Sequence, residues 1–139
     1  TTSAGTQGIV NATEAKEIIT GSFVNSEAIV NYIKHKNPEI VSLVAMGKAG
    51  KIRTEEDIYC AQYIKKLLLT GKTNNFNKIR EKLKSRSGKK FFDESKDWFQ
   101  KRDFELCMNL NKFNFILKAD FFNNDQIQEK IVGLQKLEI

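Results

Sequence analysis

The first half of the chain alternates between strand-like and helix-like patterns of apolar residues. Residues 17–23 (EIITGSF) have the composition of a short strand that ends near Gly21. In residues 25–36 (NSEAIVNYIKHK) the apolar positions recur at helical spacing, with Asn25 or Ser26 as the N-cap. The pattern therefore predicts one strand followed by one helix.

A second strand and a second helix are predicted after Pro38, a residue that forbids further helix. Residues 39–47 (EIVSLVAMG) form a nearly continuous apolar run of strand length, which is typical of a buried parallel strand. A loop rich in glycine and lysine follows, and residues 54–71 then predict a strong helix that Gly71 closes. This alternation predicts an α/β fold, layered as α/β/α, with a mixed and partly parallel sheet.

The second half of the chain has a different pattern. Residues 74–110 are helical and basic, with an interruption at Ser87 and Gly88. Residues 113–122 (FNFILKADFF) alternate as a half-buried strand does, and residues 125–137 (DQIQEKIVGLQKL) predict a last helix. The strand face predicted to be buried carries Phe113, Phe115, Leu117, Ala119 and Phe121. With 139 residues and no linker, we expect a single domain over residues 1–139.

The positive charge of the chain is concentrated in one segment. Residues 72–102 contain eleven Lys or Arg and four Asp or Glu, a net charge of +7, whereas the whole chain carries +6. Clustered cations bind phosphates, and Phe91, Phe92 and Trp98 could stack on bases, so a nucleic-acid-binding module is one interpretation. The interspersed acids favour a solvated basic face instead, and argue against a nucleic-acid partner.

Cysteine and histidine usage and the lack of long apolar runs exclude several classes of protein. Cys60 and Cys107 lie far apart without CxxC spacing, which indicates two reduced core thiols in a cytoplasmic protein. His35 is the only histidine and lies beside lysines, so no histidine triad and no histidine-rich metal site can be built. No apolar run approaches the roughly 20 residues that span a bilayer, so we expect no membrane partner.

The first residues, TTSAGTQG, combine hydroxyl groups and glycines ahead of the helix that Ile9 is predicted to begin. A glycine-containing turn at a helix N-terminus presents free backbone N–H groups to an anion. Thr2, Ser3 and Thr6 would add hydroxyl donors, and Gly5 would let a phosphate approach the backbone. An ordinary N-cap explains the same residues, and an N-terminal threonine nucleophile is a third interpretation.

Two further stretches carry candidate chemistry. In GSFVNS, Ser22 and Asn25 follow a predicted strand, where ligands of α/β sheets bind, although helix capping also explains them. In RTEEDIYCA, Glu56 and Asp57 could hold Mg²⁺, which needs only one or two carboxylates besides water and substrate phosphate. Thr54 and Asp57 also fit a capping box, so a structural role stays open.

Four segments in a fixed order resemble the second half of the 2-phosphosulfolactate phosphatase (ComB-like) family: TTSAGTQGIVNA, GSFVNSEAIVNYI, VSLVAMGKAGKIRTEEDIYCAQYI and DFELCMNLNKFNFILKA. The resemblance is weakest over residues 70–101. It implies a ComB-like fold and a Mg²⁺-dependent phosphomonoester hydrolase that releases phosphate from 2-phosphosulfolactate, in coenzyme M biosynthesis. Family members are longer, so the resemblance also implies that this chain corresponds to their C-terminal portion.

The resemblance also assigns residues to positions of the family's motifs. Its Thr-rich glycine loop falls on Thr1, Thr2, Ser3, Gly5 and Thr6, its Gly-Ser-Asn turn on Gly21, Ser22 and Asn25, and its Glu-Asp and Cys-Ala pairs on Glu56, Asp57, Cys60 and Ala61. The first two groups are thereby implied to bind phosphate, through Thr2, Ser3, Gly5, Thr6, Ser22 and Asn25. Ala4 stands where the family often has asparagine, so one ligand contact of relatives is expected to be absent.

The mechanism that the resemblance implies depends on charge and positioning. Glu56 and Asp57 are the implied catalytic and metal-binding residues, and Lys48, Lys51 and Arg53 would steer a polyanion to the site. The expected substrate is 2-phosphosulfolactate or a similar small phosphorylated acid, and a homo-oligomer is compatible with the sequence. A basic nucleic-acid-binding module and a catalytically inactive structural fragment are the alternatives.

Overall fold

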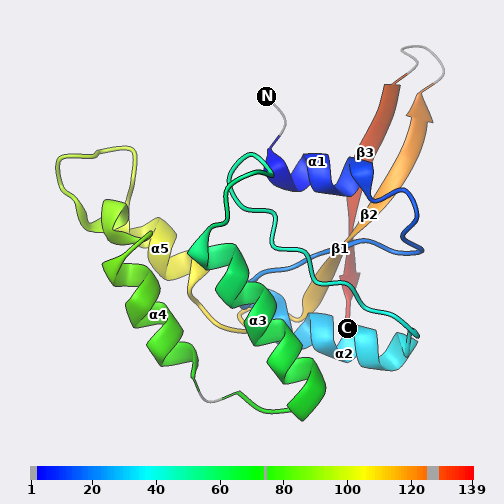
Figure 1. The fold of residues 1–139 in the computed structure, drawn as a ribbon, viewed down its shortest axis with the longest axis horizontal. Helices are drawn as coiled ribbons and strands as arrows, with labels where there is room; N and C mark the ends of the chain where they lie inside the picture. Colours follow the sequence, from blue (N-terminus) through cyan, green and yellow to red (C-terminus); the bar gives the residue numbers. More distant parts are fainter. Residues whose placement is uncertain (1–2, 74, 125–128) are drawn as a thin grey trace.

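The computed structural model describes residues 3–73, 75–124 and 129–139. Most of the helices occupy the middle of the chain, and the long strands lie near its C-terminal end (Figure 1). In chain order the elements are α1 (Ala4–Asn11), β1 (Ile19–Thr20), the 3-10 helix η1 (Phe23–Asn25), α2 (Ser26–Lys36), α3 (Glu55–Thr70), α4 (Phe76–Ser85), the 3-10 helix η2 (Lys89–Phe92), α5 (Lys101–Cys107), β2 (Phe115–Asn124) and β3 (Glu129–Glu138).

The strands form a three-stranded sheet in the order β1–β2–β3. Ile19 of β1 lies opposite Lys118 of β2, and β2 pairs with β3 along its whole length, from Phe115 opposite Glu138 onward. The mixed α/β class predicted from the sequence is confirmed. The predicted parallel pairing and the α/β/α layering are not confirmed, because every strand pair of the described residues is antiparallel.

The helix predicted over residues 125–137 is wrong for the part of it that the structure describes. Residues 129–138 form β3, while residues 125–128 lie outside the described residues. Gly133 disfavours a helix by about 1 kcal/mol relative to alanine. Without β3, one edge of the ten-residue strand β2 would also be unpaired. Strand pairing along β2 therefore outweighs the helical spacing of the apolar residues.

Burial along β2 differs from the predicted alternation. Ile116 is completely buried and Ala119 is 6% exposed, whereas Phe113 and Phe121 are 43% and 47% exposed. Helix α2 packs on β2 and covers Ile116, while the far end of the β2–β3 hairpin extends beyond the helices (Figure 1). The predicted buried face is therefore confirmed at Ala119 and wrong at Phe113 and Phe121, because the position of the helices decides which residues of the strand enter the core.

Two hydrophobic clusters meet at helix α3. The first joins the apolar face of α2 to Ile64 of α3 and Ile116 of β2. The second joins Tyr63 of α3 to residues of η1, α4 and α5, including Leu83 and Phe104. Helix α3 ends at Gly71, whose φ of 69° is the left-handed conformation that glycine adopts at helix ends. The two predicted helices in the first half are thus confirmed, and α3 is the element that joins both parts of the core.

The strand predicted over residues 39–47 is wrong in this structure. The segment is not part of the sheet, and its apolar residues face solvent, with Ile40 79% and Val44 72% exposed. Leu43 alone among its aliphatic residues packs against the α2–β2 cluster. The segment is held outside the sheet by other contacts, because Leu43 packs against the α2–β2 cluster and Met46 packs against Gly8 of α1.

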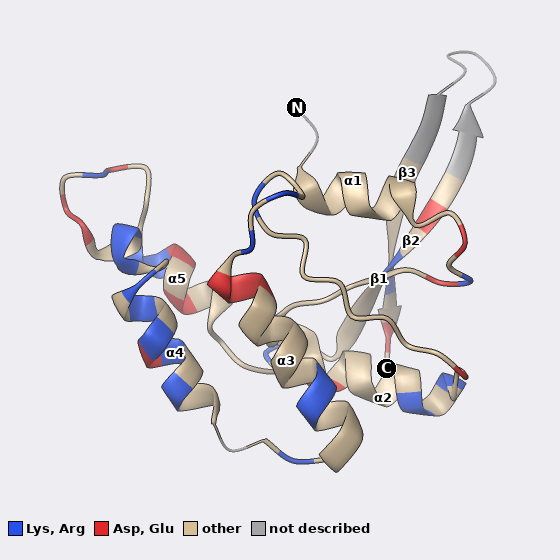
Figure 2. Cartoon of the chain, in the orientation of Figure 1, with Lys and Arg blue, Asp and Glu red and all other residues tan. Residues whose placement is uncertain are grey.

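The predicted helical and basic segment is confirmed, with its interruption close to the expected place. Helix α4 ends at Ser85, and Gly88 lies so close to α5 that a β-carbon there would be 2.6 Å from the Phe104 ring. Figure 2 shows Lys and Arg along the outer side of α4. None of the helices formed by the described residues has the length and apolar character needed to cross a membrane.

Candidate functional site

Helix α1 begins directly after the candidate phosphate-binding residues, at Ala4 rather than near Ile9. The Oγ of Ser3 is its N-cap and accepts a hydrogen bond from the backbone N–H of Thr6 at 3.2 Å. The hydroxyls of Ser3 and Thr6 lie 3.0 Å apart. Capping therefore explains Ser3 locally, yet Ser3 and Gly5 remain exposed. Thr2 and Thr1 lie outside the described residues, so their predicted roles stay predictions.

The loop of residues 46–53 packs against α1. A β-carbon at Gly8 would lie 2.5 Å from the sulfur of Met46, so α1 contacts the loop closely there. Within the loop, Gly47 has a φ of 65°, and a β-carbon on it would lie 2.1 Å from the Ile52 carbonyl oxygen. The backbone N–H of Lys48 donates to that same oxygen at 2.8 Å. The loop is therefore a tight hairpin-like turn whose conformation requires glycine.

The first turn of α3 holds the other side of the loop. Asp57 accepts a hydrogen bond from the backbone N–H of Gly47 at 2.5 Å. Thr54 makes no side-chain capping bond, so the capping box predicted for Thr54 and Asp57 is not formed. Glu55 forms an ion pair with Arg86 at 2.5 Å, and this bond raises the pKa of Arg86. Glu56 is exposed and makes no hydrogen bond or ion pair with any described residue.

Two parts of the chain that are far apart in the sequence therefore meet here: α1, and the loop together with the first turn of α3 that follows it directly (Figure 2). We call this place the α1–α3 site: the N-terminus of α1, the loop of residues 46–53, and the first turn of α3. The loop brings three exposed cations, Lys48, Lys51 and Arg53. The first-turn amides of α1 and α3 add the positive ends of two helix dipoles. The arrangement suits an anion, with the carboxylates of Glu56 and Asp57 beside it.

Ser22 and Asn25 have a different location. Ser22 accepts a hydrogen bond from the backbone N–H of Val24, and the side-chain amide of Asn25 donates to the Phe115 carbonyl at 3.2 Å. A β-carbon at the neighbouring Gly21 would lie 3.4 Å from Ile64. Ile64 follows Asp57 by seven residues, about two helical turns. The structure therefore does not bring Ser22 and Asn25 together with the α1–α3 site.

Sequence reasoning missed Asn111, which caps α2 from a distant part of the chain. Its Oδ1 accepts hydrogen bonds from the hydroxyl of Ser26 at 2.7 Å and from the backbone N–H of Glu27 at 3.0 Å. Asn25 occupies the predicted N-cap position but makes no capping bond, and its own buried Oδ1 has no partner among the described residues. The one signal for this capping role is the residue type, because Asn111 has a φ of 52°, a left-handed conformation that asparagine tolerates.

The two cysteines differ in their surroundings. Burial raises the pKa of the Cys60 thiol to about 12, and the charge of Asp57 adds to the shift. Cys60 is thus an inert thiol packed against both hydrophobic clusters, as predicted. Cys107 is exposed at the end of α5, so the prediction of a core thiol is wrong there. Its position on the solvent side of a short helix explains the difference.

The carboxylates available for a cation are few. Among the described residues, no three His, Cys, Asp or Glu side chains gather in a group that could hold a metal ion. Glu56 offers a free carboxylate, and Asp57 keeps one oxygen beyond its bond to Gly47. Consecutive helical residues point in different directions. This donor set fits an ion that keeps most of its water shell, as Mg²⁺ does, and not one that requires many protein ligands.

Comparison with known proteins identifies relatives of the chain. Residues 1–120 match the model of the family described as 2-phosphosulpholactate phosphatase. A probable 2-phosphosulfolactate phosphatase of Caldicellulosiruptor saccharolyticus is 38% identical over 73 residues, which are 50% of this chain and 30% of that protein. Another, of a Nostoc species, is 35% identical over 60 residues, 43% of this chain and 24% of that protein. The match thus spans less than a third of each relative. No solved structure matches the chain significantly.

Proposed function

Because the chain belongs to the 2-phosphosulpholactate phosphatase family, we propose that it forms part of a phosphoric monoester hydrolase that releases phosphate from 2-phosphosulfolactate or a similar small phosphorylated acid. The observation that carries this proposal is the α1–α3 site. The contact between Met46 and Gly8 and the hydrogen bond between Asp57 and Gly47 join two of the four family-like segments, the first and the third, around one exposed loop. The pathway context that we propose is coenzyme M biosynthesis.

The phosphate ester would bind at the N-terminus of α1. Of the two hydroxyls of Ser3 and Thr6, one donates to the other, so the acceptor's proton is free to turn to a phosphoryl oxygen. Gly5 lets the anion approach the backbone amides of the first turn. Lys48 and Lys51 would attract a substrate that carries both phosphate and a second acidic group. Binding and orientation are the main needs of phosphoryl transfer, so no protein nucleophile is required.

We also propose that Mg²⁺ binds beside the substrate, held by Glu56 and Asp57 directly or through its bound water. When bound, the ion would neutralise charge on the phosphoryl oxygens and activate a water molecule. The bond from the Gly47 amide holds Asp57 towards the loop, and the free carboxylate of Glu56 faces solvent, where a hydrated ion can reach it. The roles of Ser22 and Asn25 as phosphate ligands stay a prediction, which their position beside the middle of α3 does not favour.

We further propose that the layered, partly parallel arrangement of the sequence prediction belongs to longer members of the family. Residues 39–47 keep the apolar content of a buried strand while Ile40 and Val44 are exposed. The curated relatives contain much sequence beyond the matched part. A strand from such sequence would cover the segment and give it a parallel or antiparallel neighbour. Replacement of Ile40 and Val44 by threonine should raise the solubility of this chain without lowering its stability.

The experiment that tests the function measures phosphate release from 2-phosphosulfolactate, with and without Mg²⁺, by this chain and by a full-length protein containing it. We expect Mg²⁺-dependent release by the full-length protein and its loss in Glu56→Ala. Glu39→Ala is the matched control, because Glu39 is also exposed and unpaired among the described residues but lies outside the α1–α3 site.

Each outcome decides one part of the proposal. Release by the full-length protein but not by this chain assigns essential groups to the remaining sequence. Unchanged turnover in Glu56→Ala removes Glu56 from the mechanism. No release by either protein removes the substrate assignment and leaves an inactive structural unit as the better interpretation.

A further inference from the structure

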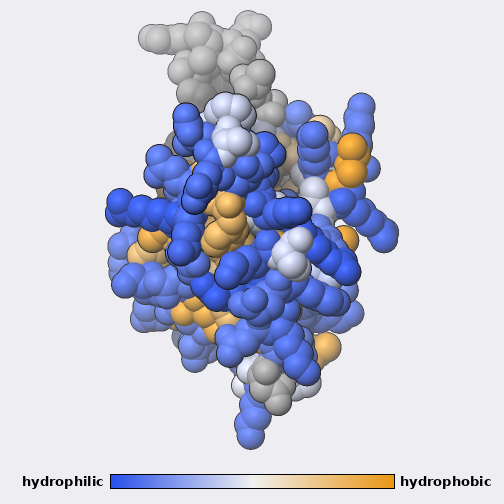
Figure 3. Space-filling model, turned by 90° about the vertical axis from the view of Figure 1, so that its left-hand side faces the viewer, coloured by the Kyte–Doolittle hydropathy of each residue, from blue (hydrophilic) through white to orange (hydrophobic). Residues whose placement is uncertain are grey.

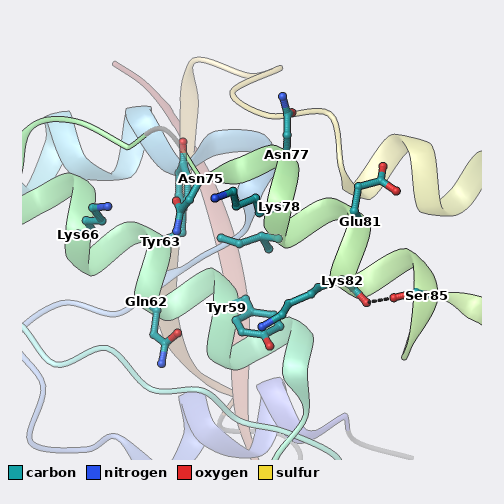
Figure 4. A pocket seen from close by; sticks show the side chains of 11 residues that line it. Tyr59, Gln62, Tyr63, Lys66, Asn75, Asn77, Lys78, Glu81, Lys82 and Ser85 are labelled. Atoms are coloured by element: carbon teal, nitrogen blue, oxygen red, sulfur yellow. Dashed lines mark hydrogen bonds between the residues drawn. The ribbon is translucent and has the colours of Figure 1, made fainter.

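A groove runs between α3 and α4, away from the α1–α3 site (Figure 4). Its volume is about 1070 Å³. The buried Tyr63 and Ile79 and the half-buried Tyr59 give it an apolar floor. Its position between two helices suits a segment of polypeptide, which can lay apolar side chains on the floor.

The rim of this α3–α4 groove is positively charged. Lys66 projects from α3, and Lys78 and Lys82 extend from α4 across the groove (Figure 4). Lys66 and Lys78 are exposed and their ammonium groups have no partner among the described residues, whereas Lys82 lies over the Tyr59 ring at 5.6 Å. With Glu81 as its acid, the groove carries a net charge of +2. It therefore favours an occupant with negative charge.

The floor and the rim together define the occupant. Apolar side chains can cover the rings of Tyr59 and Tyr63, and acidic side chains can pair with Lys66 and Lys78. The occupant that fits the groove is thus both acidic and apolar.

The turn of residues 93–98 (DESKDW) has both properties. Trp98 is 73% exposed and Phe99 is its ring neighbour. Its indole offers a large apolar surface and an N–H donor. Glu94 and Asp97 are exposed and make no bond with any described residue, and the whole turn has a net charge of −2. In Figure 1 the chain of this turn forms a loop that projects outward before α5.

The turn is held in shape before any partner binds. Asp93 accepts hydrogen bonds from the hydroxyl and backbone N–H of Ser95 and forms an ion pair with Lys96. Phe99 packs edge-on against Phe91 at 5.4 Å, which anchors the end of the turn. A preformed turn loses little conformational entropy on docking. Trp98 is therefore presented as an anchor of the kind that dominates protein interfaces.

We propose that the 93–98 turn of one copy of this chain docks in the α3–α4 groove of a second copy. The charges of −2 and +2 complement each other, and the indole covers the apolar floor. Figure 3 shows the side of the molecule that includes α4 as mostly hydrophilic, with small separate apolar areas. The contact is accordingly small, reversible and weakened by salt.

The test is sedimentation equilibrium of the chain at low salt over a range of concentrations. We expect reversible self-association, which the charge reversals Lys78→Glu with Lys82→Glu abolish. The reversals Glu94→Lys with Asp97→Lys should abolish it as well. An equal mixture of the two variants should associate again, because each then supplies the surface that matches the other. Trp98→Ala should weaken association about tenfold or more.

The matched control reverses Lys34 and Lys65, two exposed lysines without partners among the described residues and outside the groove. It changes the net charge equally and should associate as the wild type does. Circular dichroism of every variant shows whether it is folded. A wild type that stays monomeric, or a variant mixture that does not associate, overturns the proposal. Binding of single-stranded DNA that is lost on reversal of Lys78 and Lys82, with the wild type monomeric, would assign the groove to nucleic acid instead.

Discussion

Two apolar segments on either side of Pro38 have opposite surroundings. Helix α2 before it buries Ala28, Ile29 and Val30 almost completely, whereas the segment after it exposes Ile40 and Val44. Both have the composition of core elements. Helix α2 packs against β2 and α3, whereas residues 39–47 pair with no strand of the described sheet. An apolar pattern thus indicates that a segment would be stabilised by burial. The rest of the chain determines whether another segment is there to bury it.

The largest expected difference between these regions is in stability. Ile116→Ala should lower the free energy of unfolding by about 2–5 kcal/mol, because it empties a completely buried site between α2 and β2. Ile40→Ala should change it by less than about 0.5 kcal/mol, because that side chain is already in water. Denaturant unfolding measures both. Equal effects of the two substitutions would show that residues 39–47 are packed in solution.

A smaller effect on stability is expected at Gly47, in the tight turn of residues 46–53. Gly47→Ala should destabilise the chain by roughly 1–3 kcal/mol, because its β-carbon would meet the Ile52 carbonyl in a strained backbone conformation. Gly71→Ala is the control: Gly71 has the same left-handed conformation but open space around it. If Gly71→Ala costs as much as Gly47→Ala, close packing of the loop is not the cause.

The smallest expected effect concerns the pH dependence of stability at the start of the sheet. Burial alone raises the pKa of Glu17, but hydrogen bonds from Tyr32 and Lys118 and their positive surroundings outweigh it, so the pKa lies below 4.5. A carboxyl with a depressed pKa contributes stability above its unfolded value. That contribution is lost as the pH falls through the lower folded value.

Glu17→Gln should therefore reduce stability at neutral pH and converge with the wild type as the pH falls below the lowered pKa of folded Glu17. Thermal unfolding at several pH values measures this difference. The wild-type advantage should also shrink as salt is added, because the pair of Glu17 and Lys118 is partly exposed. A difference that grows on acidification would contradict the assigned direction of the Glu17 shift.

Much of the candidate site was predictable because it depends on local patterns. The hydroxyl and glycine residues before α1, the glycine loop and the acids of α3 were each identified from the sequence. Their meeting around residues 46–53 was not, because it depends on one bond from Gly47 to Asp57 and on the contact of Met46 with Gly8. The cap that Asn111 provides to α2 was unpredictable for the same reason, because it joins residues 84 positions apart.

The sequence by itself determined α2 and α3, their ends, and the interruption before α5. These depend on residue spacing and on residues such as Gly71, whose effects act within a few positions. Only the tertiary structure decided that residues 129–138 pair as β3, that Ile116 rather than Phe121 enters the core, and that Ile40 and Val44 stay exposed. Each of these depends on which surface another segment offers, and a strand or a buried face is stable only when that surface is present.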